Sequence, residues 1–406
     1  MSRHVLILNR WTNRFAEYHR HLDHERTAVS YLTTQAGAHR LSDRAEEIRV
    51  VDDIDDIDEL TRHATELATL HGGFTHIVAL SEFDLIHAGI LRDRLGVPGR
   101  GERDVALVRD KVAMKHAVAA AGLRVPWHRP VDGRDHFAAM ADELDYPVVV
   151  KPRLGADSQE VHVLTDAAAA HGLLESDSPL DGFECEEFIQ GEFYQVDGVV
   201  ADGELRLSRS WHCLASCLDF AGGLPFASVA NDDADLERRI TDFTVRVTQA
   251  LRLVDDVFHL ELFVEHGTGD LVFLEVGARA GGGQVRFVWD EVYGVDLVRA
   301  SLLCAVGDRA ALPAPPTSNQ VAGYLMMPQP PMRPCTVHSV SSLRGTIDGL
   351  YAEELPTPGT VLAGNGGAIH TAGVYRFALP TAAEVEAAIA RTREDYRIDW
   401  SSAGAA

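Results

Sequence analysis

The feature that most limits the fold is a pair of alternating apolar segments, residues 257–264 and 271–276, joined by a Gly-Thr-Gly turn around Thr268. Successive side chains of a strand point to opposite faces, so the apolar residues share one face and Glu261 lies on the other. A turn centred on Thr268 would place Glu261 directly opposite Glu275, with Cβ atoms about 4.5–5.5 Å apart. The sequence therefore predicts a β-hairpin with two facing carboxylates.

Two carboxylates that face each other across a sheet repel unless something neutralises them. Divalent magnesium does so, and it binds carboxylate and phosphate oxygens together. The spacing alone leaves two alternatives open. The two carboxyl groups can share a proton, or the register can slip by one residue and leave one glutamate in solvent.

An arginine and a glycine run follow the second glutamate. Arg279 lies four residues after Glu275, and Gly281-Gly282-Gly283 follows it. Glycines let a backbone approach a ligand closely, and an arginine beside a magnesium site stabilises charge that passes between phosphate and acceptor. A flexible surface loop with a solvated arginine is the alternative interpretation.

Two lysines stand at places where a chain can meet phosphates. Lys151 ends the apolar run 147–152 and precedes the loop Gly155-Ala156-Asp157-Ser158, whose backbone N–H groups can fold over an anion. A surface lysine with a buried stem is the alternative for Lys151. Lys111 follows Asp110, a predicted helix cap, and a lysine at a helix start is usually solvated.

The length of 406 residues exceeds what one hydrophobic core usually supports, so we expect two or three domains. Up to about residue 107, short apolar runs such as Val5–Leu8 alternate with helical patterns, which predicts a small parallel sheet. A hairpin is expected around Asp202-Gly203. The proline-rich stretch 313–316 is the best linker candidate, and a third lobe would follow it.

The composition excludes some partners. The net charge of −24 opposes binding to nucleic acid and to anionic membranes. The apolar runs are far shorter than the ~20 residues of a membrane span, and the first residues read as a strand, so we expect a cytoplasmic protein. The five cysteines include no C-x-x-C pair, which favours reduced, structural thiols.

Taken in order, these segments resemble the ATP-grasp superfamily and its carboxylate–amine branch, which includes the L-amino-acid ligases. The resemblance covers about residues 1–310. It is carried by Asp110-Lys111, the run 149–152, Glu186-Glu187-Phe188-Ile189-Gln190-Gly191, Phe258-His259-Leu260-Glu261, Glu275-Val276-Gly277-Ala278-Arg279-Ala280-Gly281-Gly282 and Tyr293-Gly294-Val295-Asp296-Leu297.

The resemblance implies an α/β architecture with a Rossmann-like N-terminal domain (1–107), an ATP-grasp domain (108–312) and a C-terminal lobe (313–406). The ATP-grasp domain would divide into a small lobe, about 112–187, and a large lobe, about 188–312. The segment 184–191 reads as an edge strand, which would cross between the lobes and offer backbone groups to an adenine.

The resemblance also implies roles for individual residues. Glu261 and Glu275 would hold Mg²⁺, with Mn²⁺ as an alternative. The ATP would contact Lys111, Lys151, Gly155, Ser158, Glu186, Glu187, Phe188, Ile189 and, at the ribose, Glu192. Arg279 and Lys151 would be catalytic. Candidate substrate contacts are Glu82, His212, Arg279, Gly282 and Gly283, although a solvated loop glutamate is the commoner interpretation of Glu82.

One departure concerns the metal shell. Many relatives have an asparagine two residues after the second glutamate, where this chain has Gly277. The expected reaction is an ATP-dependent ligation: a small carboxylate becomes an acyl phosphate, and an amine then displaces phosphate. The alternatives are a bicarbonate-dependent carboxylase of the same superfamily and a non-catalytic nucleotide-binding module. A homodimer is a family-level expectation.

Overall fold

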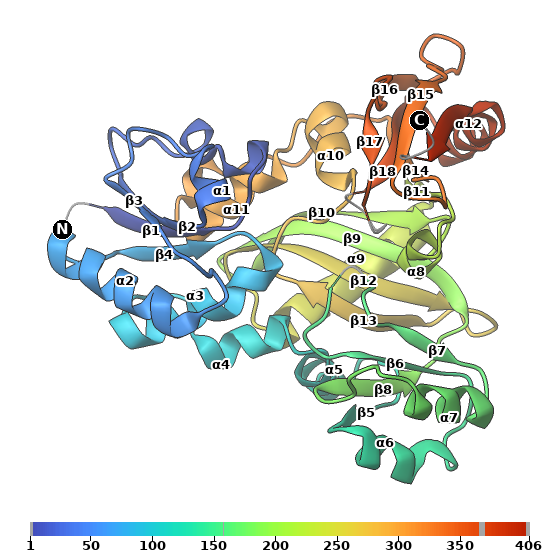
Figure 1. The fold of residues 1–406 in the computed structure, drawn as a ribbon, viewed down its shortest axis with the longest axis horizontal. Coiled ribbons are helices and arrows are strands. Elements are labelled where there is room, and N and C mark those ends of the chain that lie inside the picture. The colour runs from blue at the N-terminus through green and yellow to red at the C-terminus, as the bar shows by residue number, and fades with distance from the viewer. Residues whose placement is uncertain (1–2, 157, 365–369, 403–406) are drawn as a thin grey trace.

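The computed structural model describes residues 3–156, 158–364 and 370–402 (Figure 1). The N-terminal part contains a parallel sheet with the order β3-β2-β1-β4. Its strands are β1 (His4–Asn9), β2 (Ala28–Thr33), β3 (Glu47–Val50) and β4 (His76–Ala79). The predicted parallel sheet is confirmed, and the apolar strand β1 is buried along its whole length.

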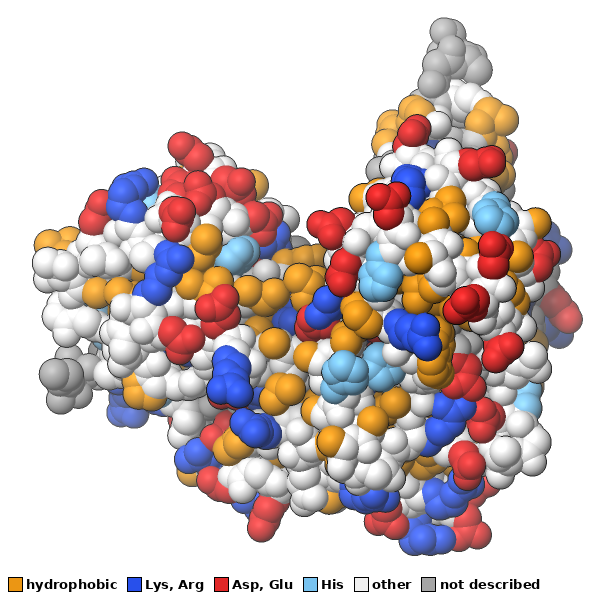
Figure 2. Space-filling model, turned by 90° about the horizontal axis from the view of Figure 1, so that it is seen from below, with side chains coloured by type: hydrophobic (Ala, Val, Ile, Leu, Met, Phe, Trp, Pro, Cys, Tyr) orange, Lys and Arg blue, Asp and Glu red, His pale blue; other side chains and the backbone are white. Residues whose placement is uncertain are grey.

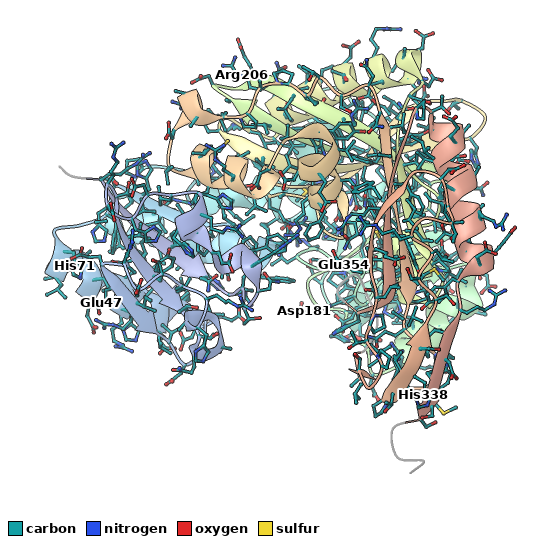
Figure 3. All side chains as sticks on the ribbon, turned by 90° about the horizontal axis from the view of Figure 1, so that it is seen from above. Glu47, His71, Asp181, Arg206, His338 and Glu354 are labelled. Carbon is teal, nitrogen blue, oxygen red and sulfur yellow. The ribbon has the colours of Figure 1, made fainter. Side chains whose placement is uncertain are left out.

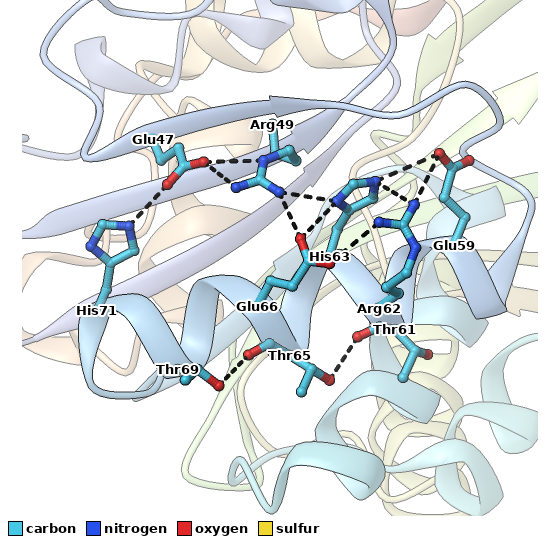
Figure 4. Close-up of polar contacts among 10 residues, drawn as sticks. All are labelled: Glu47, Arg49, Glu59, Thr61, Arg62, His63, Thr65, Glu66, Thr69 and His71. Carbon is cyan, nitrogen blue, oxygen red and sulfur yellow. Dashed lines mark hydrogen bonds and ion pairs between the residues drawn. The ribbon is translucent and has the colours of Figure 1, made fainter.

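Helices surround this sheet. They are α1 (Gln35–Ala38), α2 (Ile57–His71), α3 (Leu85–Leu95) and α4 (Glu102–Val105), with short 3-10 turns η1 (Arg14–Ala16), η2 (Tyr18–Arg20), η3 (Glu82–Asp84) and η4 (Ala106–Val108). Helix α3 ends at Gly96, which adopts a left-handed conformation with φ of 66°. A polar network links β3 to the outer face of α2 through Glu47, Arg49, His63 and Glu66 (Figure 4).

A second, antiparallel sheet forms the small lobe. Its order is β5-β8-β6-β7, with β5 (His128–Val131), β6 (Val148–Pro152), β7 (His162–Leu164) and β8 (Phe183–Glu187). Helices α5 (Lys111–Ala120), α6 (Arg134–Ala141) and α7 (Ala167–Glu175) accompany it. The expectation of an edge strand at 184–191 is wrong: β8 lies between β5 and β6, because the proline-containing β5, which gave no clear strand pattern, pairs with its free side.

An eight-stranded sheet is the centre of the molecule, in the order β13-β12-β9-β10-β11-β14-β18-β16. The strands are β9 (Gly191–Ala201), β10 (Glu204–Cys213), β11 (Phe226–Ala230), β12 (Asp256–Glu265), β13 (Leu271–Gly277), β14 (Val321–Pro328), β16 (Leu350–Glu354) and β18 (Thr371–Leu379). The hairpin predicted at Asp202-Gly203 is confirmed by the pairing of β9 with β10. Helix α9 (Ala234–Ala250) buries its apolar stripe against the β9–β12–β13 side.

The residues after the 313–320 segment, which has no regular structure, continue this same sheet, because β14 pairs with β11. A small sheet of β17 (Val361–Leu362), β15 (Cys335–Val340) and β19 (Ile398–Ser402) and helix α12 (Ala382–Asp395) complete the C-terminal part. In the sequence, helix α8 (Cys217–Ala221) connects β10 to β11. Helices α10 (Val285–Tyr293) and α11 (Leu297–Ala305) and the turn η5 (Arg309–Ala311) connect β13 to β14. None of the helices in the described ranges is both long and apolar enough to span a bilayer.

Candidate active site

The two glutamates of the hairpin do face each other, as predicted. Glu261 of β12 pairs with Glu275 of β13. Nearer the turn, Leu262 pairs with Phe273, so the register shifts by one residue at Leu274. Next to the turn, the strands therefore have the register, shifted by one residue, that the sequence left open. A β-bulge at Leu274 compensates for this shift, so that Glu261 and Glu275 still face each other.

Lys111 neutralises one of these carboxylates. Its Nζ lies 3.2 Å from Glu275 Oε2 and donates a 2.7 Å hydrogen bond to the Gly155 carbonyl oxygen. Burial raises the pKa of Glu275, but the charges of Lys111 and Lys151 outweigh it and lower this pKa to about 2. The solvated interpretation of Lys111 is wrong, because the side chain is buried between the hairpin and the 155–158 loop. Within that loop, Asp157 lies outside the described residues.

Four buried charges form a neutral cluster beside Lys111. Lys115 Nζ lies 2.5 Å from Glu184 and 2.8 Å from Glu186, and Lys151 Nζ lies 2.5 Å from Glu186. Burial lowers the pKa of Lys151, but Glu186 and Glu184 outweigh it and raise that pKa. The surface interpretation of Lys151 is wrong. The side chain of Glu186 faces the two lysines, so at most its backbone is free to meet a base.

Sequence reasoning missed Lys115, although a signal was present. The chain has three lysines, Lys111, Lys115 and Lys151, among 37 basic residues, and all three are buried around the same carboxylates. Lys111 and Lys115 are four residues apart on α5 and therefore share one face of the helix. Since arginine supplies every other permanent side-chain cation, the positions that keep lysine were themselves informative.

Glu82 is buried, so its interpretation as a solvated loop residue is wrong. Its carboxylate accepts hydrogen bonds of 2.5 Å from Arg109 Nη1 and 2.5 Å from Arg279 Nε. Burial raises the pKa of Glu82, and the charges of Arg279 and Arg109 lower it further than burial raises it. A Cβ added to Gly277 would lie 2.8 Å from Glu82 Oε2. Glycine at 277 thus gives the Glu82 carboxylate the space that a side chain would fill.

His259 is a further buried group on the face of Glu261. Its Nδ1 lies 2.9 Å from Asp197 Oδ1 and its Nε2 lies 3.5 Å from Glu261 Oε1. Burial lowers the pKa of His259, but Asp197 and Glu261 outweigh it and raise this pKa to about 9. Gln195 Nε2 donates a 3.2 Å hydrogen bond to the same Glu261 oxygen. His259 lies two residues before Glu261 and therefore on the same face of β12, and its partner Asp197 comes from the neighbouring strand β9.

Two cavities meet at the glutamate pair. The inner cavity is lined by Glu82, Lys111, Gln195, His259, Arg279, Gly282, Gly283, Tyr324 and Met326, among others. The outer cleft is lined by Lys151, Glu186, Glu187, Phe188, Ile189, Gln190, Glu192 and residues of α8. Glu261, Glu275, Lys111, Gly155, Ser158 and Cys217 line both. Figure 2 shows the face of the molecule that points down in Figure 1, coloured by side-chain type.

Two predicted residues lie apart from the centre of the site. His212 is not among the residues that line either cavity, and it stacks on Tyr194 with ring centroids 5.0 Å apart. Glu192 lines the outer cleft, but its carboxylate already pairs with His212 at 2.9 Å and with His266 at 3.2 Å. The assignment of Glu192 to a ribose stays a prediction.

The donor set suits a hard cation. Two facing carboxylates lie at the junction of the cavities, and Mg²⁺ prefers oxygen ligands with a few carboxylates. Without a nucleotide, the charge of Lys111 neutralises that of Glu275. The phosphate oxygens of a bound nucleotide would compete with Glu275 for this lysine. Residues and charge at this place therefore fit a magnesium–nucleotide complex.

No protein-family model matches the chain. It is 24% identical over 307 residues to the L-arginine-specific L-amino acid ligase of Bacillus subtilis, covering 74% of each chain. It is 27% identical over 232 residues to dapdiamide A synthase of Enterobacter agglomerans, covering 54% of this chain and 53% of that protein. The chain thus spans three quarters of one relative and about half of the other.

A solved L-amino acid ligase from Bacillus licheniformis superposes with a TM-score of 0.75 at 16% identity, covering 98% of this chain and 99% of that one. The chain therefore has the fold of this ligase, and its sequence is similar to those of two carboxylate–amine ligases. The biotin carboxylase domain of a Hydrogenobacter thermophilus 2-oxoglutarate carboxylase, solved with MgADP and bicarbonate, has the same fold with a TM-score of 0.66 at 16% identity. The coverage is 98% of this chain and 91% of that one. The predicted fold class is therefore confirmed, and the predicted resemblance to amino acid ligases agrees with the sequence relatives.

Proposed function

We propose that this ATP-grasp protein activates a small carboxylate, an amino acid by preference, as an acyl phosphate and couples it to an amine. The products are an amide or dipeptide, ADP and phosphate. The observation that carries the proposal is the place of Glu261 and Glu275: they line both cavities, so a nucleotide in the outer cleft and a carboxylate in the inner cavity would meet at them.

Bound MgATP supplies the phosphoryl group and the cation that offsets its charge. The chain's own residues hold the reacting groups in place. Lys151 and Lys111 flank the glutamates and would face the phosphates, with the backbone of Gly155 and Ser158 above them. Phosphoryl transfer needs charge neutralisation and in-line placement more than a protein nucleophile, and these groups provide both.

Arg279 would stabilise the developing acyl phosphate on the inner side. Its Nε is held by Glu82, which fixes the guanidinium at the wall of the inner cavity. A carboxylate oxygen of the donor attacks the γ-phosphorus and ADP leaves. The amine then attacks the acyl carbon, phosphate leaves with the bonding electrons, and the amine loses one proton. Closure of the 155–158 loop would keep water away from the acyl phosphate.

Several finer points belong to the same proposal. The relatives' names support an amino-acid donor, one of them an arginine-specific ligase, but which donor and acceptor this chain takes is a matter for the screen below. Mg²⁺ is the proposed ion, with Mn²⁺ as an alternative. The division at residues 107 and 312, a homodimer and a cytoplasmic location stay predictions from the sequence.

The decisive experiment is a phosphate-release screen over pairs of amino acids and small acids, with the products identified by mass. We expect a condensation product and ADP in equal amounts without bicarbonate. Glu275→Gln should lower turnover by at least about 100-fold, because it weakens a metal ligand and leaves Lys111 unbalanced. The control is Glu204→Gln, whose side chain is 75% exposed and remote from both cavities. Turnover that required bicarbonate would favour the carboxylase, and an unchanged Glu275→Gln rate would favour a non-catalytic module.

The scarcity of lysine allows a second, independent test. An amine-reactive ATP analogue with a reactive acyl group on its terminal phosphate can label only three side chains in this sequence. We expect Lys111 and Lys151 to be labelled and protected by ATP. Lys115, which is 0% exposed, should stay unlabelled. Labelling at Lys115 alone, or at none of the three, would contradict the placement of the nucleotide.

A further inference from the structure

Arg109 connects the N-terminal sheet domain to the segment that follows β6. Its Nη1 donates a 2.5 Å hydrogen bond to Glu82 Oε1, and its Nη2 donates a 2.8 Å hydrogen bond to the Leu154 carbonyl oxygen. Glu82 lines the inner cavity, and Leu154 directly precedes Gly155, which lines both cavities. Because Arg109 is itself buried, one guanidinium joins the wall of the inner cavity to the edge of the outer cleft.

A second arginine holds the same segment without reaching the inner cavity. Arg153 Nε donates a 3.1 Å hydrogen bond to Asp110 Oδ1, and its Nη2 lies 2.5 Å from Asp110 Oδ2. Neither Arg153 nor Asp110 is among the described residues that line the two cavities. Both arginines therefore fix the same stretch of backbone, but of the two only Arg109 also contacts Glu82.

Glu82 is shared between Arg109 and the arginine proposed to face the acyl group. Its Oε2 accepts a 2.5 Å hydrogen bond from Arg279 Nε. One carboxylate thus serves two guanidinium groups, which leaves one positive charge in excess among the three side chains. The charge of Glu275 also acts on Glu82, but Lys111 neutralises it. A carboxylate that enters the inner cavity would therefore be attracted to Arg279 and would compete with Glu82 for it.

This competition changes how firmly Arg109 is held. When Arg279 pairs with the entering carboxylate, Glu82 keeps one partner, and its full charge acts on Arg109. A guanidinium is planar and rigid, so a firmer contact at one edge also fixes the other edge, which holds the Leu154 carbonyl group. Leu154 and Gly155 would then be ordered before the nucleotide binds, which lowers the entropic cost of nucleotide binding.

We propose that Arg109 is a positioning residue that couples the two cavities, so that the donor carboxylate and the nucleotide strengthen each other's binding. This rests on the proposed ligase function, which places the donor in the inner cavity. By linkage, the factor by which the donor lowers the Kd of the nucleotide equals the factor by which the nucleotide lowers the Kd of the donor. The competing explanations are a purely structural joint and direct binding of the donor by Arg109. Neither makes this coupling factor depend on Arg109.

The coupling factor is measured by calorimetry on the full chain, with Mg²⁺, a non-hydrolysable ATP analogue and the donor identified in the phosphate-release screen. For the wild type we expect the donor to lower the Kd of the analogue at least about 5-fold, the lower end of typical coupling. Arg109→Lys keeps a positive charge beside Glu82, but one ammonium group cannot span both partners as the guanidinium fork does. In this variant the factor should fall below about 2.

A second measurement on the wild type needs no nucleotide. The Gly155 N–H donates a 3.3 Å hydrogen bond to the Pro152 carbonyl oxygen within the segment that Arg109 holds. The donor alone should slow hydrogen exchange of this amide at least about 3-fold, because ordering of the segment suppresses local opening. The donor should not slow this exchange in Arg109→Lys.

Two control variants separate coupling from structure. Arg153→Lys loosens the same segment without touching Glu82, so nucleotide binding should weaken equally with and without donor, and the coupling factor should persist. Arg206→Ala removes an exposed arginine that lies at the opposite edge of the molecule from His338 (Figure 3), and it should change neither affinity.

Three results would overturn this proposal alone. They are a wild-type coupling factor below about 2, an equal factor in wild type and Arg109→Lys, and an equal loss of coupling in Arg109→Lys and Arg153→Lys. A wild-type protein that released no phosphate with any pair in the screen would overturn the ligase function and this proposal with it.

Discussion

Replacing Lys115 by methionine tests the neutral cluster of the small lobe in isolation. Lys115 and Glu184 are both 0% exposed, and their charged atoms are 2.5 Å apart. At an effective dielectric constant of about 20, one such contact is worth roughly 7 kcal/mol, and the contact with Glu186 at 2.8 Å roughly 6 kcal/mol. Desolvation of the buried ions, several kcal/mol each, offsets much of this.

The loss after substitution has a limit that follows from proton uptake. Without Lys115, two carboxylates share the single charge of Lys151, and the variant can escape by protonating one of them. Protonating a carboxyl group with the ordinary glutamate pKa of 4.5 costs about 3.4 kcal/mol at pH 7 and about 1.4 kcal/mol at pH 5.5. We therefore expect Lys115→Met to lower the unfolding free energy of the small lobe by about 3 kcal/mol at pH 7 and by less than half of that at pH 5.5.

Urea unfolding followed by circular dichroism at the two pH values measures this difference. The matched control is Arg26→Met, which removes a cation from a side chain that is 88% exposed and should change stability by less than about 0.5 kcal/mol. A loss below about 1 kcal/mol at pH 7, or a loss equal at both pH values, would show that the four charges are not a closed, desolvated cluster.

Other perturbations follow from the same site. Gly277→Ala should displace the Glu82 carboxylate, because the new Cβ would lie 2.8 Å from Oε2, and we expect a loss of turnover of at least about 10-fold with a small change in melting temperature. The pKa of Glu275 is lowered in the folded protein, so its contribution to stability is present above about pH 4.5 and is lost as pH falls toward about 2. Acid titration of the metal-free protein should show that loss, and Glu275→Gln should flatten it. The pKa of His259 is raised to about 9, so its stabilising effect is complete below about pH 6.5 and lost as pH rises through 9. His259→Asn should thus cost more melting temperature at pH 6 than at pH 10, and an equal cost would refute the Asp197 pairing.

The periodicity of apolar residues was enough to predict an element wherever its structure depends on residues close together in the sequence. The alternating hairpin and the cap of α5 at Asp110 both appear as predicted, because each depends on side chains a few positions apart. What the sequence did not contain was the partner of each charge. Lys111, Lys151 and Glu82 looked like solvated residues because their counter-ions come from segments tens of residues away.

The facing glutamates show how a correct prediction can rest on an incomplete reason. A regular hairpin continued from the tip pairing of Val264 with Leu271 would set Glu261 against Leu274 and turn Glu275 to the other face. The extra residue in β13 prevents this, and no composition signal at Leu274 announces it. The bulge is therefore best understood as part of the site, since it is what aims both carboxylates at the junction of the two cavities.

Gly277 and Glu82 complete that argument. The missing asparagine at 277 first appeared as a gap in the metal shell, but the structure fills the same space with a carboxylate from the N-terminal sheet domain. That carboxylate holds Arg279 from one side and Arg109 from the other. A longer residue at 277 would have to push Glu82 away and release both arginines. Gly277→Asn and Glu82→Ser should therefore each lower turnover, and the double variant should lose less free energy of activation than the two single losses added, because both changes release the same arginines. A fully active Gly277→Asn single variant would show that the Glu82 carboxylate does not need this place.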